Sequence, residues 1–331
     1  MWTFTEARPK GDVDEHWTGC VCSETGQHMI AYSRYESYYS DDYGVTWSAA
    51  AAVGQGYSWM QVMASAPPFM SADGSRVLIL EWLGTNPNRV IRRSTDYGAT
   101  YPTNIVSTYQ IVSLAADGDC NHISSGNAAR DQWTLGYPYV STNGGTSFTS
   151  PWGGGHQWYG QAWSKNGTYG LFGCRYDTFG WTDYGHIYKT INGGVSWTEI
   201  FPVADTSTSS WNDGFISDDG QIIRCNSYLS TNGGSSWTNT GTSAPYRTNA
   251  DCSKALRLSS YRLYFSEDYG VTQEEVRPKG DVNVYWCEPA LSHNGEYMMV
   301  GDFNNATAGG RLYIGTFTPG GPSDALQMAG D

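Results

Sequence analysis

Acidic residues stand in several apparent loops, where they could perform acid–base chemistry. Hydrolysis of a glycosidic bond needs two carboxyl groups that flank the bond at a defined separation. Residues that could supply such a pair are Glu15, Glu81, Asp177, Asp183, Glu288 and Asp302. The sequence singles out no pair, and an isolated acid in a loop is more often a solvated surface group. The candidate catalytic residues are Glu15, Glu81, Asp177 and Asp302.

A second set of residues could bind a ligand without reacting with it. Four tryptophans each stand six residues before a serine that opens a turn, namely Trp17, Trp158, Trp211 and Trp286. We assign the equivalent place in other repeats to Trp59, Tyr109 and Arg247. Such aromatic rings can stack on sugar faces or hold apolar side chains of a partner. Because the same tryptophan recurs as a packing element would, burial in the core is the competing interpretation.

Two departures from the repeat add candidate ligand contacts. Arg247 replaces the aromatic residue, and its guanidinium could bind a ligand carboxylate or form a salt bridge within the protein. Segment 175–184 is an insertion that contributes Arg175 and Trp181. Further long loops are expected at 81–86 and 302–305. Unequal loops on one face can build a binding groove.

Other reactive patterns are absent from the sequence. It has no nucleophile elbow, phosphate-binding loop or HExxH motif. Cys20 and Cys22 would lie on one face of a strand, but no second cysteine pair completes a zinc set. We therefore expect no metal and no cofactor, and we interpret most of the 7 cysteines as small buried apolar residues.

Composition limits the classes of partner. The 331 residues carry 19 Lys and Arg against 32 Asp and Glu, a net charge of −13. Such a surface is poorly suited to nucleic acid or anionic membranes. The sequence has no apolar run of membrane-helix length, and its first residues lack the pattern of a signal peptide. We expect a soluble chain, cytoplasmic or associated with a virion, of unknown localisation and oligomeric state.

One short pattern, Ser-x-Asp/Asn-x-Gly-x-Thr/Ser-aromatic, recurs along the chain. Its six copies are residues 40–47, 94–101, 141–148, 190–197, 230–237 and 266–273. The Asp or Asn and the hydroxyl groups can bond local backbone N–H groups, glycine accepts a positive φ, and the aromatic residue packs between sheets. The pattern predicts a hairpin turn whose polar backbone groups are hydrogen-bonded by side chains of the turn itself.

A second turn pattern precedes the first in each repeat. Its clearest copies open at Ser23, Ser164, Ser217 and Ser292, each followed by an alternating strand. Each unit thus reads as four antiparallel strands joined by two kinds of turn. Repeated units of this kind, with a mean length of about 47 residues, predict the blades of an all-β propeller.

The seventh unit lacks its last strand at the C-terminal end. Residues 6–13, EARPKGDV, repeat residues 275–282, EVRPKGDV, which follow the fourth strand of unit six. By this register, segment 3–8 supplies the missing strand and closes a seven-bladed ring of four-stranded blades. We predict one domain over residues 1–318 and a loosely ordered tail over 319–331.

At these repeated turns the chain resembles the Asp-box, or BNR-repeat, propellers of the sialidase-like superfamily. This group includes sialidases, xyloglucanases, sortilin-type receptors, photosystem assembly factors and uncharacterised bacterial and phage proteins, which the chain resembles most. The resemblance implies the fold over nearly the whole chain and says little about function. No arginine here is followed by Ile-Pro, as the sialidase motif requires, so no catalytic residue is carried over.

These observations favour a non-enzymatic propeller that binds a glycan or a protein partner. Its binding face would be formed by the starts of the innermost strands and the loops between second and third strands. A glycoside hydrolase or polysaccharide lyase that uses paired loop carboxylates is the first alternative, and a structural or assembly module is the second. The resemblance to phage proteins suggests a virion-surface component.

Overall fold

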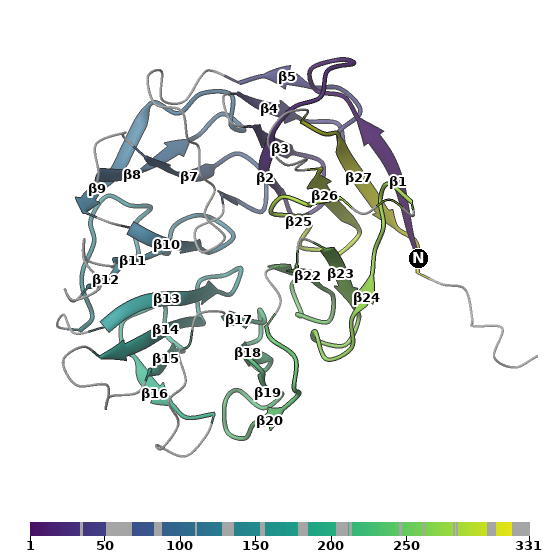
Figure 1. Cartoon of the computed structure of the whole chain (residues 1–331). Helices are drawn as coiled ribbons and strands as arrows, with labels where there is room; N and C mark the ends of the chain where they lie inside the picture. The colour runs from purple at the N-terminus through teal and green to yellow at the C-terminus, as the bar shows by residue number, and fades with distance from the viewer. Residues whose placement is uncertain are drawn as a thin grey trace, which may run out of the picture.

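The computed structural model describes most of the chain. The described residues are 1–33, 36–50, 68–82, 88–109, 111–127, 136–152, 156–177, 185–202, 211, 214–244, 247–260, 262–280, 282, 284–302 and 309–319. They contain strands and turns and no helix. The strands form seven antiparallel sheets arranged in a ring, which confirms the predicted seven-bladed propeller (Figure 1).

We number the blades I–VII in chain order and letter their strands A–D from the channel outward. Blade I contains β2 (Trp17–Cys22), β3 (Met29–Ser33), β4 (Ser37–Ser40) and β5 (Ser48–Ala49). Blade II contains β6 (Phe69–Met70), β7 (Val77–Trp82), β8 (Asn88–Ser94) and β9 (Thr103–Tyr109). Blade III contains β10 (Ile111–Ala116), β11 (Ile123–Asn127) and β12 (Pro138–Ser141). Its outermost position is held by a bridge between Val140 and Thr149.

The remaining four blades each have four strands. Blade IV contains β13 (His156–Trp163), β14 (Gly170–Asp177), β15 (Ile187–Thr190) and β16 (Thr198–Ile200). Blade V contains β17 (Gly214–Ile216), β18 (Ile223–Cys225), β19 (Tyr228–Ser230) and β20 (Thr238–Asn239). Blade VI contains β21 (Arg247–Thr248), β22 (Ala255–Ser259), β23 (Arg262–Ser266) and β24 (Glu274–Glu275). Blade VII contains β25 (Ala290–Leu291), β26 (Tyr297–Gly301), β27 (Leu312–Phe317) and β1 (Trp2–Ala7).

The N-terminal strand closes the ring, as the EARPKGDV repeat predicts. β1 pairs antiparallel with β27, from Trp2 opposite Phe317 to Ala7 opposite Leu312. The N-terminal ammonium of Met1 donates to the carbonyl of Thr318 at 2.7 Å. Because β1 covers β27, blade VII has the same number of strands as its neighbours and the outer edge of β27 is paired.

The repeated C–D turn has the predicted internal hydrogen bonds. In the first copy, Ser40 Oγ accepts from Gly44 N at 2.9 Å, and Asp42 Oδ1 accepts from Thr46 N at 2.8 Å. Asn232 makes the same contact with Ser236 N at 2.9 Å, so the amide replaces the carboxylate without changing the turn. The left-handed conformation falls on Tyr43 and Gly44, with φ of 62° and 80°.

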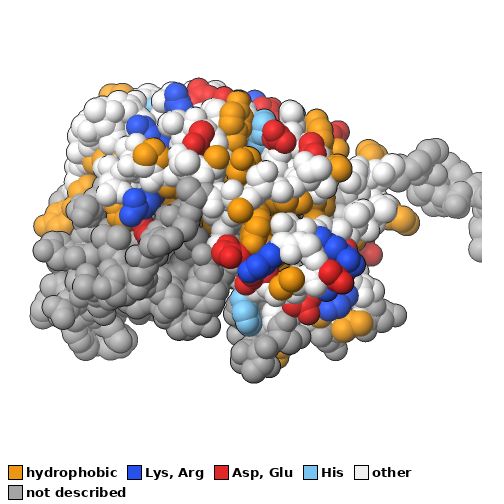
Figure 2. Space-filling view, turned by 90° about the horizontal axis from the view of Figure 1, so that it is seen from above, with side chains coloured by type: hydrophobic (Ala, Val, Ile, Leu, Met, Phe, Trp, Pro, Cys, Tyr) orange, Lys and Arg blue, Asp and Glu red, His pale blue; other side chains and the backbone are white. Residues whose placement is uncertain are grey.

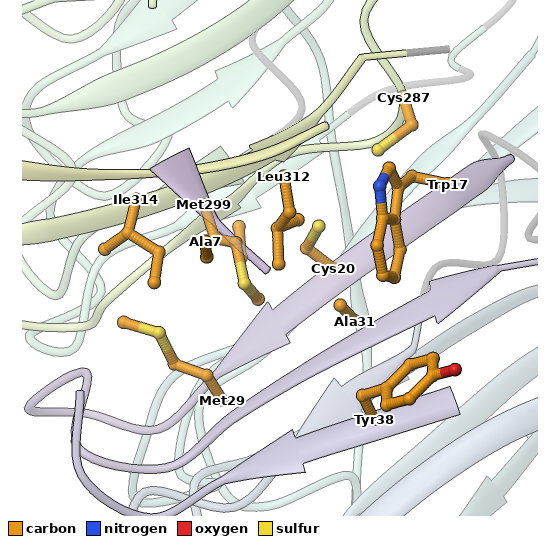
Figure 3. Close-up of a cluster of buried hydrophobic side chains, with 11 residues drawn as sticks. Ala7, Trp17, Cys20, Met29, Ala31, Tyr38, Cys287, Met299, Leu312 and Ile314 are labelled. Carbon is orange, nitrogen blue, oxygen red and sulfur yellow. The ribbon is translucent and has the colours of Figure 1, made fainter. Parts of the chain in front are cut away.

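The core lies between the blades. Six clusters of buried hydrophobic side chains each join two consecutive blades, and Figure 3 shows the cluster between blades VII and I. There Met299 and Leu312 of blade VII meet Cys20 and Met29 of blade I, and all four are fully buried. All seven cysteines are free thiols and six are buried, which confirms the prediction that most act as small apolar residues.

Charges are dispersed over the part of the outer surface in view. Figure 2 looks at the molecule from above Figure 1, where acidic, basic and hydrophobic side chains are interspersed over the described residues. No helix among those residues is long and apolar enough to cross a membrane.

Candidate functional site

The A strands of all seven blades line a central channel, which encloses a cavity of about 270 Å³. Every blade contributes one residue to the channel wall from the same place in its A strand. This residue stands two positions before the residue that opens the A–B turn. In six blades this residue is apolar, namely Val21, Phe69, Ala115, Ala162, Phe215 and Ala290. In blade VI it is Arg247. The channel therefore presents one cation at a level where every other blade presents a hydrophobic group.

Arg247 reaches from blade VI toward blade VII. Its Nη2 lies 4.0 Å from Oε2 of Glu288, a buried acid of blade VII. Burial lowers the pKa of the guanidinium, and the nearby charge of Glu288 opposes this shift. The Arg247 side chain is 21% exposed, while its Nη2 atom is buried. The channel wall thus carries a partly exposed arginine side chain beside a buried carboxylate.

One end of the channel is bounded by a ring of hydrogen bonds between the A–B turns, which we call the turn belt. In each link an N–H group of one blade donates to an oxygen of the following blade. Six links are between backbone groups: Glu24 to Ala72, Ala72 to Gly118, Gly118 to Lys165, Asp218 to Ala250, Ala250 to His293, and Asn294 to Glu24. In the seventh link, Lys165 N donates to Oδ1 of Asp218 at 2.7 Å.

Two pairs of an acidic and a basic side chain lie within the turn belt. Lys165 Nζ donates to Oε1 of Glu24 at 2.7 Å, and His293 Nε2 lies 2.8 Å from Oδ2 of Asp218. Burial alone would raise the pKa of Asp218, but the hydrogen bonds from His293 and Lys165 N outweigh it and lower that pKa. The four side chains of these pairs line the cavity at this end.

The four recurring tryptophans lie in the core. Trp17, Trp158, Trp211 and Trp286 are 2%, 0%, 3% and 6% exposed, and each belongs to a cluster shared with the preceding blade. The indole N–H of Trp17 donates to Gly310 O at 3.1 Å, and that of Trp211 donates to Gly185 O at 2.8 Å. Of the two interpretations left open by the sequence, these positions support packing.

Tyr109 and Arg247 do not occupy the repeat position to which the sequence pattern assigned them. The A–B turns of blades III and VI open at Asp117 and Asn249, whose side chains accept from His122 N and Lys254 N at 3.1 and 2.8 Å. These acceptors replace the serine oxygen that the pattern requires. Tyr109 consequently lies at the end of β9 in blade II, not in an A strand. Arg247 stands two residues before its turn and not six.

The candidate acids among the described residues are buried, and each forms an ion pair with a basic side chain. Glu15, Glu81 and Asp302 are 8%, 4% and 0% exposed. Glu15 pairs with Lys10 at 2.9 Å and Asp302 pairs with Lys279 at 2.8 Å, while Glu81 pairs with Arg92. The other candidates are less defined. Asp177 and Arg175 lie in β14 with side chains outside the described part of the chain, and Trp59 and Trp181 lie wholly outside it.

The sequence reasoning missed the residues of the turn belt. Their shared signal is position, because all except Asn294 directly follow the residue that opens an A–B turn. Four of these positions are ionisable, namely Glu24, Lys165, Asp218 and His293. An alignment of the seven turns places these four residues at equivalent positions, which indicates that they surround the channel at the same height. Among the described residues, no group of His, Cys, Asp and Glu is placed to hold a metal ion.

Comparisons with known proteins identify the fold. No protein-family model matches the sequence, and no curated protein matches it. The structure is similar to that of YCF48 bound to D1 peptide, with a TM-score of 0.54 and 12% identity over 96% of this chain and 97% of that one. It is also similar to YCF48 from Cyanidioschyzon merolae, with a TM-score of 0.52 and 14% identity over 95% and 98% of the two chains.

A third similar structure is an enzyme. The GH74 enzyme of Niastella koreensis matches with a TM-score of 0.51 and 14% identity over 86% of this chain. The match spans only 62% of the enzyme. At these identities the three likenesses establish a propeller and leave its activity open.

Proposed function

We propose that the chain is a binding propeller that holds a carboxylate-bearing peptide segment of a protein partner in its central channel. The observation that carries the proposal is Arg247, a cation in a ring of otherwise apolar wall residues. A guanidinium offers several N–H donors in a planar fork that matches a carboxylate. The surrounding apolar wall would contact the hydrophobic parts of the same segment.

The size of the channel favours a short segment. The cavity of about 270 Å³ is slightly smaller than most ligand pockets, so it would accept a few side chains and not a folded domain. A carboxylate brought to Arg247 would be partly removed from water, which strengthens the ionic hydrogen bond. Because Glu288 lies 4.0 Å from Nη2 of Arg247, a ligand carboxylate would bind to the other N–H groups of the guanidinium.

The direction of entry follows from the turn belt. The pairs Lys165–Glu24 and His293–Asp218 line the A–B turn end of the channel. We expect a segment to enter from the opposite end, where the A strands start. This is the face that the sequence pattern favours for binding.

The similar structures lend this proposal support of a limited kind. One of them, YCF48, is bound to a peptide, and it matches this chain over nearly its full length. A peptide partner is therefore compatible with this architecture. The narrower expectations, namely an Asp-box identity, a glycan ligand and a place on a virion, stay predictions.

The hydrolase alternative finds less support. Although GH74 is an enzyme, the described candidate acids Glu15, Glu81 and Asp302 each have an oxygen occupied by a basic side chain. A pair acting on a glycosidic bond must present its oxygens to the sugar. We therefore favour binding over hydrolysis.

The test is selection from a display library of random short peptides with free C-termini, followed by affinity measurements on the winners. We expect winners with a carboxylate and an apolar neighbour, and affinities at least about tenfold weaker for Arg247→Leu. Arg262→Leu is the matched control, because Arg262 is 41% exposed on strand C of the same blade. Winners that bind Arg247→Leu as tightly would refute the proposal, and retention only on a glycan array would favour a lectin.

A further inference from the structure

The interface between blades V and VI differs from the other six blade interfaces. Each of the others holds a cluster of buried hydrophobic side chains. Among the residues that the structure describes, no such cluster joins blades V and VI. Polar residues occupy the corresponding register positions there.

The first of these positions is Arg224 in β18. It pairs with Phe215 of strand A, as Ile30 pairs with Val21 in blade I. The equivalent residue is apolar in five other blades, namely Ile30, Leu78, Leu171, Leu256 and Met299, and each is buried in a cluster shared with the following blade. In blade III it is Ser124, which is also buried. The side chain of Arg224 therefore points toward blade VI.

The hydrogen bonds of Arg224 agree with this direction. Its Nη2 donates to the carbonyl and hydroxyl oxygens of Thr242 at 2.8 and 2.7 Å, and Thr242 Oγ1 donates to Gly270 O of blade VI at 3.0 Å. Arg224 is 0% exposed. Its Nε and Nη1 atoms are buried and have no acceptor among the described residues.

Blade VI directs a second arginine to the same interface. Leu256 faces blade VII, so the next residue of β22, Arg257, lies on the opposite face of the sheet, toward blade V. Its equivalents in five other blades are Ala31, Ile79, Phe172, Cys225 and Val300, all buried, and in blade III it is the buried Ser125. Arg257 Nη1 donates to Oε1 of Gln273 at 3.4 Å.

Gln273 is itself a substitution in the repeated pattern. It ends the C–D turn of blade VI, where other turns end in Trp47, Tyr101, Phe148, Trp197 and Trp237. Those aromatic residues contribute to the cluster with the preceding blade. Three register positions that are apolar at most other interfaces are thus polar together only at this one, and arginine occupies two of them only here.

The positive charge at this interface lacks a close partner. Burial lowers the pKa of Arg224 to about 10, with Asp268 opposing and Arg257 adding to the shift. The guanidinium therefore remains protonated at neutral pH. Neither arginine forms an ion pair with a described carboxylate. A buried unpaired cation costs several kcal/mol unless an anion compensates it.

We propose that the interface between blades V and VI is a binding site for an oxyanion, held between Arg224 of blade V and Arg257 of blade VI. Oxygen atoms of a phosphate or carboxylate group would accept from Nε and Nη1 of Arg224 and from Arg257. The anion would replace the missing hydrophobic cluster as the contact between the two blades. This site is independent of the channel and of Arg247.

Inorganic phosphate is the probe for the first test. Calorimetric titration is expected to give one site, and thermal unfolding at constant ionic strength should occur about 2 °C or more higher in phosphate than in chloride. Arg224→Met and Arg257→Met should each weaken phosphate binding at least about tenfold. Arg262→Met, which alters an exposed arginine of the same blade, should leave it unchanged.

Two further arms make the result decisive. Acetate in place of phosphate distinguishes a carboxylate site from a phosphate site, because only the preferred anion should raise the midpoint. Phosphate-free Arg224→Met should be at least as stable as the wild type, since the apolar side chain removes the buried charge. The proposal is wrong if neither anion binds the wild-type protein, or if both methionine variants bind it as the wild type does.

Discussion

Lys165 Nζ donates to Oε1 of Glu24 at 2.7 Å, although the two residues are 141 positions apart in the sequence. Lys165 belongs to blade IV and Glu24 to blade I, so the contact crosses the channel mouth within the turn belt. It is one of two pairs of an acidic and a basic side chain there, and the backbone links of the belt hold both in place. The contact therefore depends on closure of the whole ring.

A double-mutant cycle should show that this pair contributes modestly. With Lys165→Met and Glu24→Gln, we expect a coupling free energy of about 0.5 kcal/mol at low salt, because both side chains are more than a third exposed and water screens the charges. Denaturant unfolding of the four proteins measures it. The coupling should fall as salt is added. A coupling that is independent of salt would mean that packing, not charge, links the two residues.

The repeated C–D turns should make stability depend on acid pH. Hydrogen bonds from Thr46 lower the pKa of Asp42 below its ordinary value of 3.8, and the pKa values of Asp96 and Asp268 are lowered because similar hydrogen bonds outweigh the effect of burial. A lowered folded-state pKa stabilises the protein above the unfolded value. This stabilisation is lost as the pH falls through the folded value.

The chain itself supplies the matched substitution for this prediction. Asn143, Asn192 and Asn232 form the same turn without a titrating group. The triple variant Asp42→Asn/Asp96→Asn/Asp268→Asn should therefore be close to wild type at pH 7 and lose less stability below about pH 4, by about 1 kcal/mol in total. Urea unfolding across this range measures the difference. Asp41→Asn, at an exposed position, should follow the wild type, and parallel profiles for all three proteins would contradict the prediction.

Trp158 should matter for stability in a way that a surface residue would not. It is fully buried, and Trp152 stacks on it with ring centres 5.0 Å apart. Trp158→Ala should cost about 3–5 kcal/mol of unfolding free energy, because it leaves a cavity between blades III and IV. Denaturant unfolding tests this, with Tyr137→Ala as a control at a 45% exposed aromatic residue. An unchanged stability would return Trp158 to the ligand-binding candidates.

The sequence was most informative about local structure. The C–D turn could be predicted because every group that it needs, from Ser40 to Thr46, lies within one short segment. The strand that closes blade VII could be predicted because the EARPKGDV segment recurs at the corresponding place in blade VI. In both cases the information is contained in a contiguous pattern.

Contacts between blades were harder to predict, because they depend on register. In blade VI, Asn249 opens the A–B turn in place of the serine that the pattern requires. Because this substitution was not recognised in the sequence, Arg247 was assigned to the wrong register position. The tryptophan pattern was recognised, but whether Trp17 faces a ligand or the core depends on the neighbouring blade that covers it. Nothing in the local sequence around Arg224 indicates that its side chain is buried between two blades.

Closure by β1 should prevent self-association through the edge of β27. Removing residues 1–7 would expose the edge of β27 and uncover Phe317, against which Trp2 packs with ring centres 5.1 Å apart. An unpaired edge beside an apolar surface favours pairing with a second chain. We therefore expect the truncated protein to self-associate in analytical ultracentrifugation and to unfold at lower temperature. The matched control moves residues 1–7 to follow Thr318 through a flexible linker, which is feasible because Met1 N lies 2.7 Å from Thr318 O. This permuted chain should sediment as the wild type does, whereas a truncated chain that sediments like the wild type and is equally stable would show that β1 is dispensable for closure.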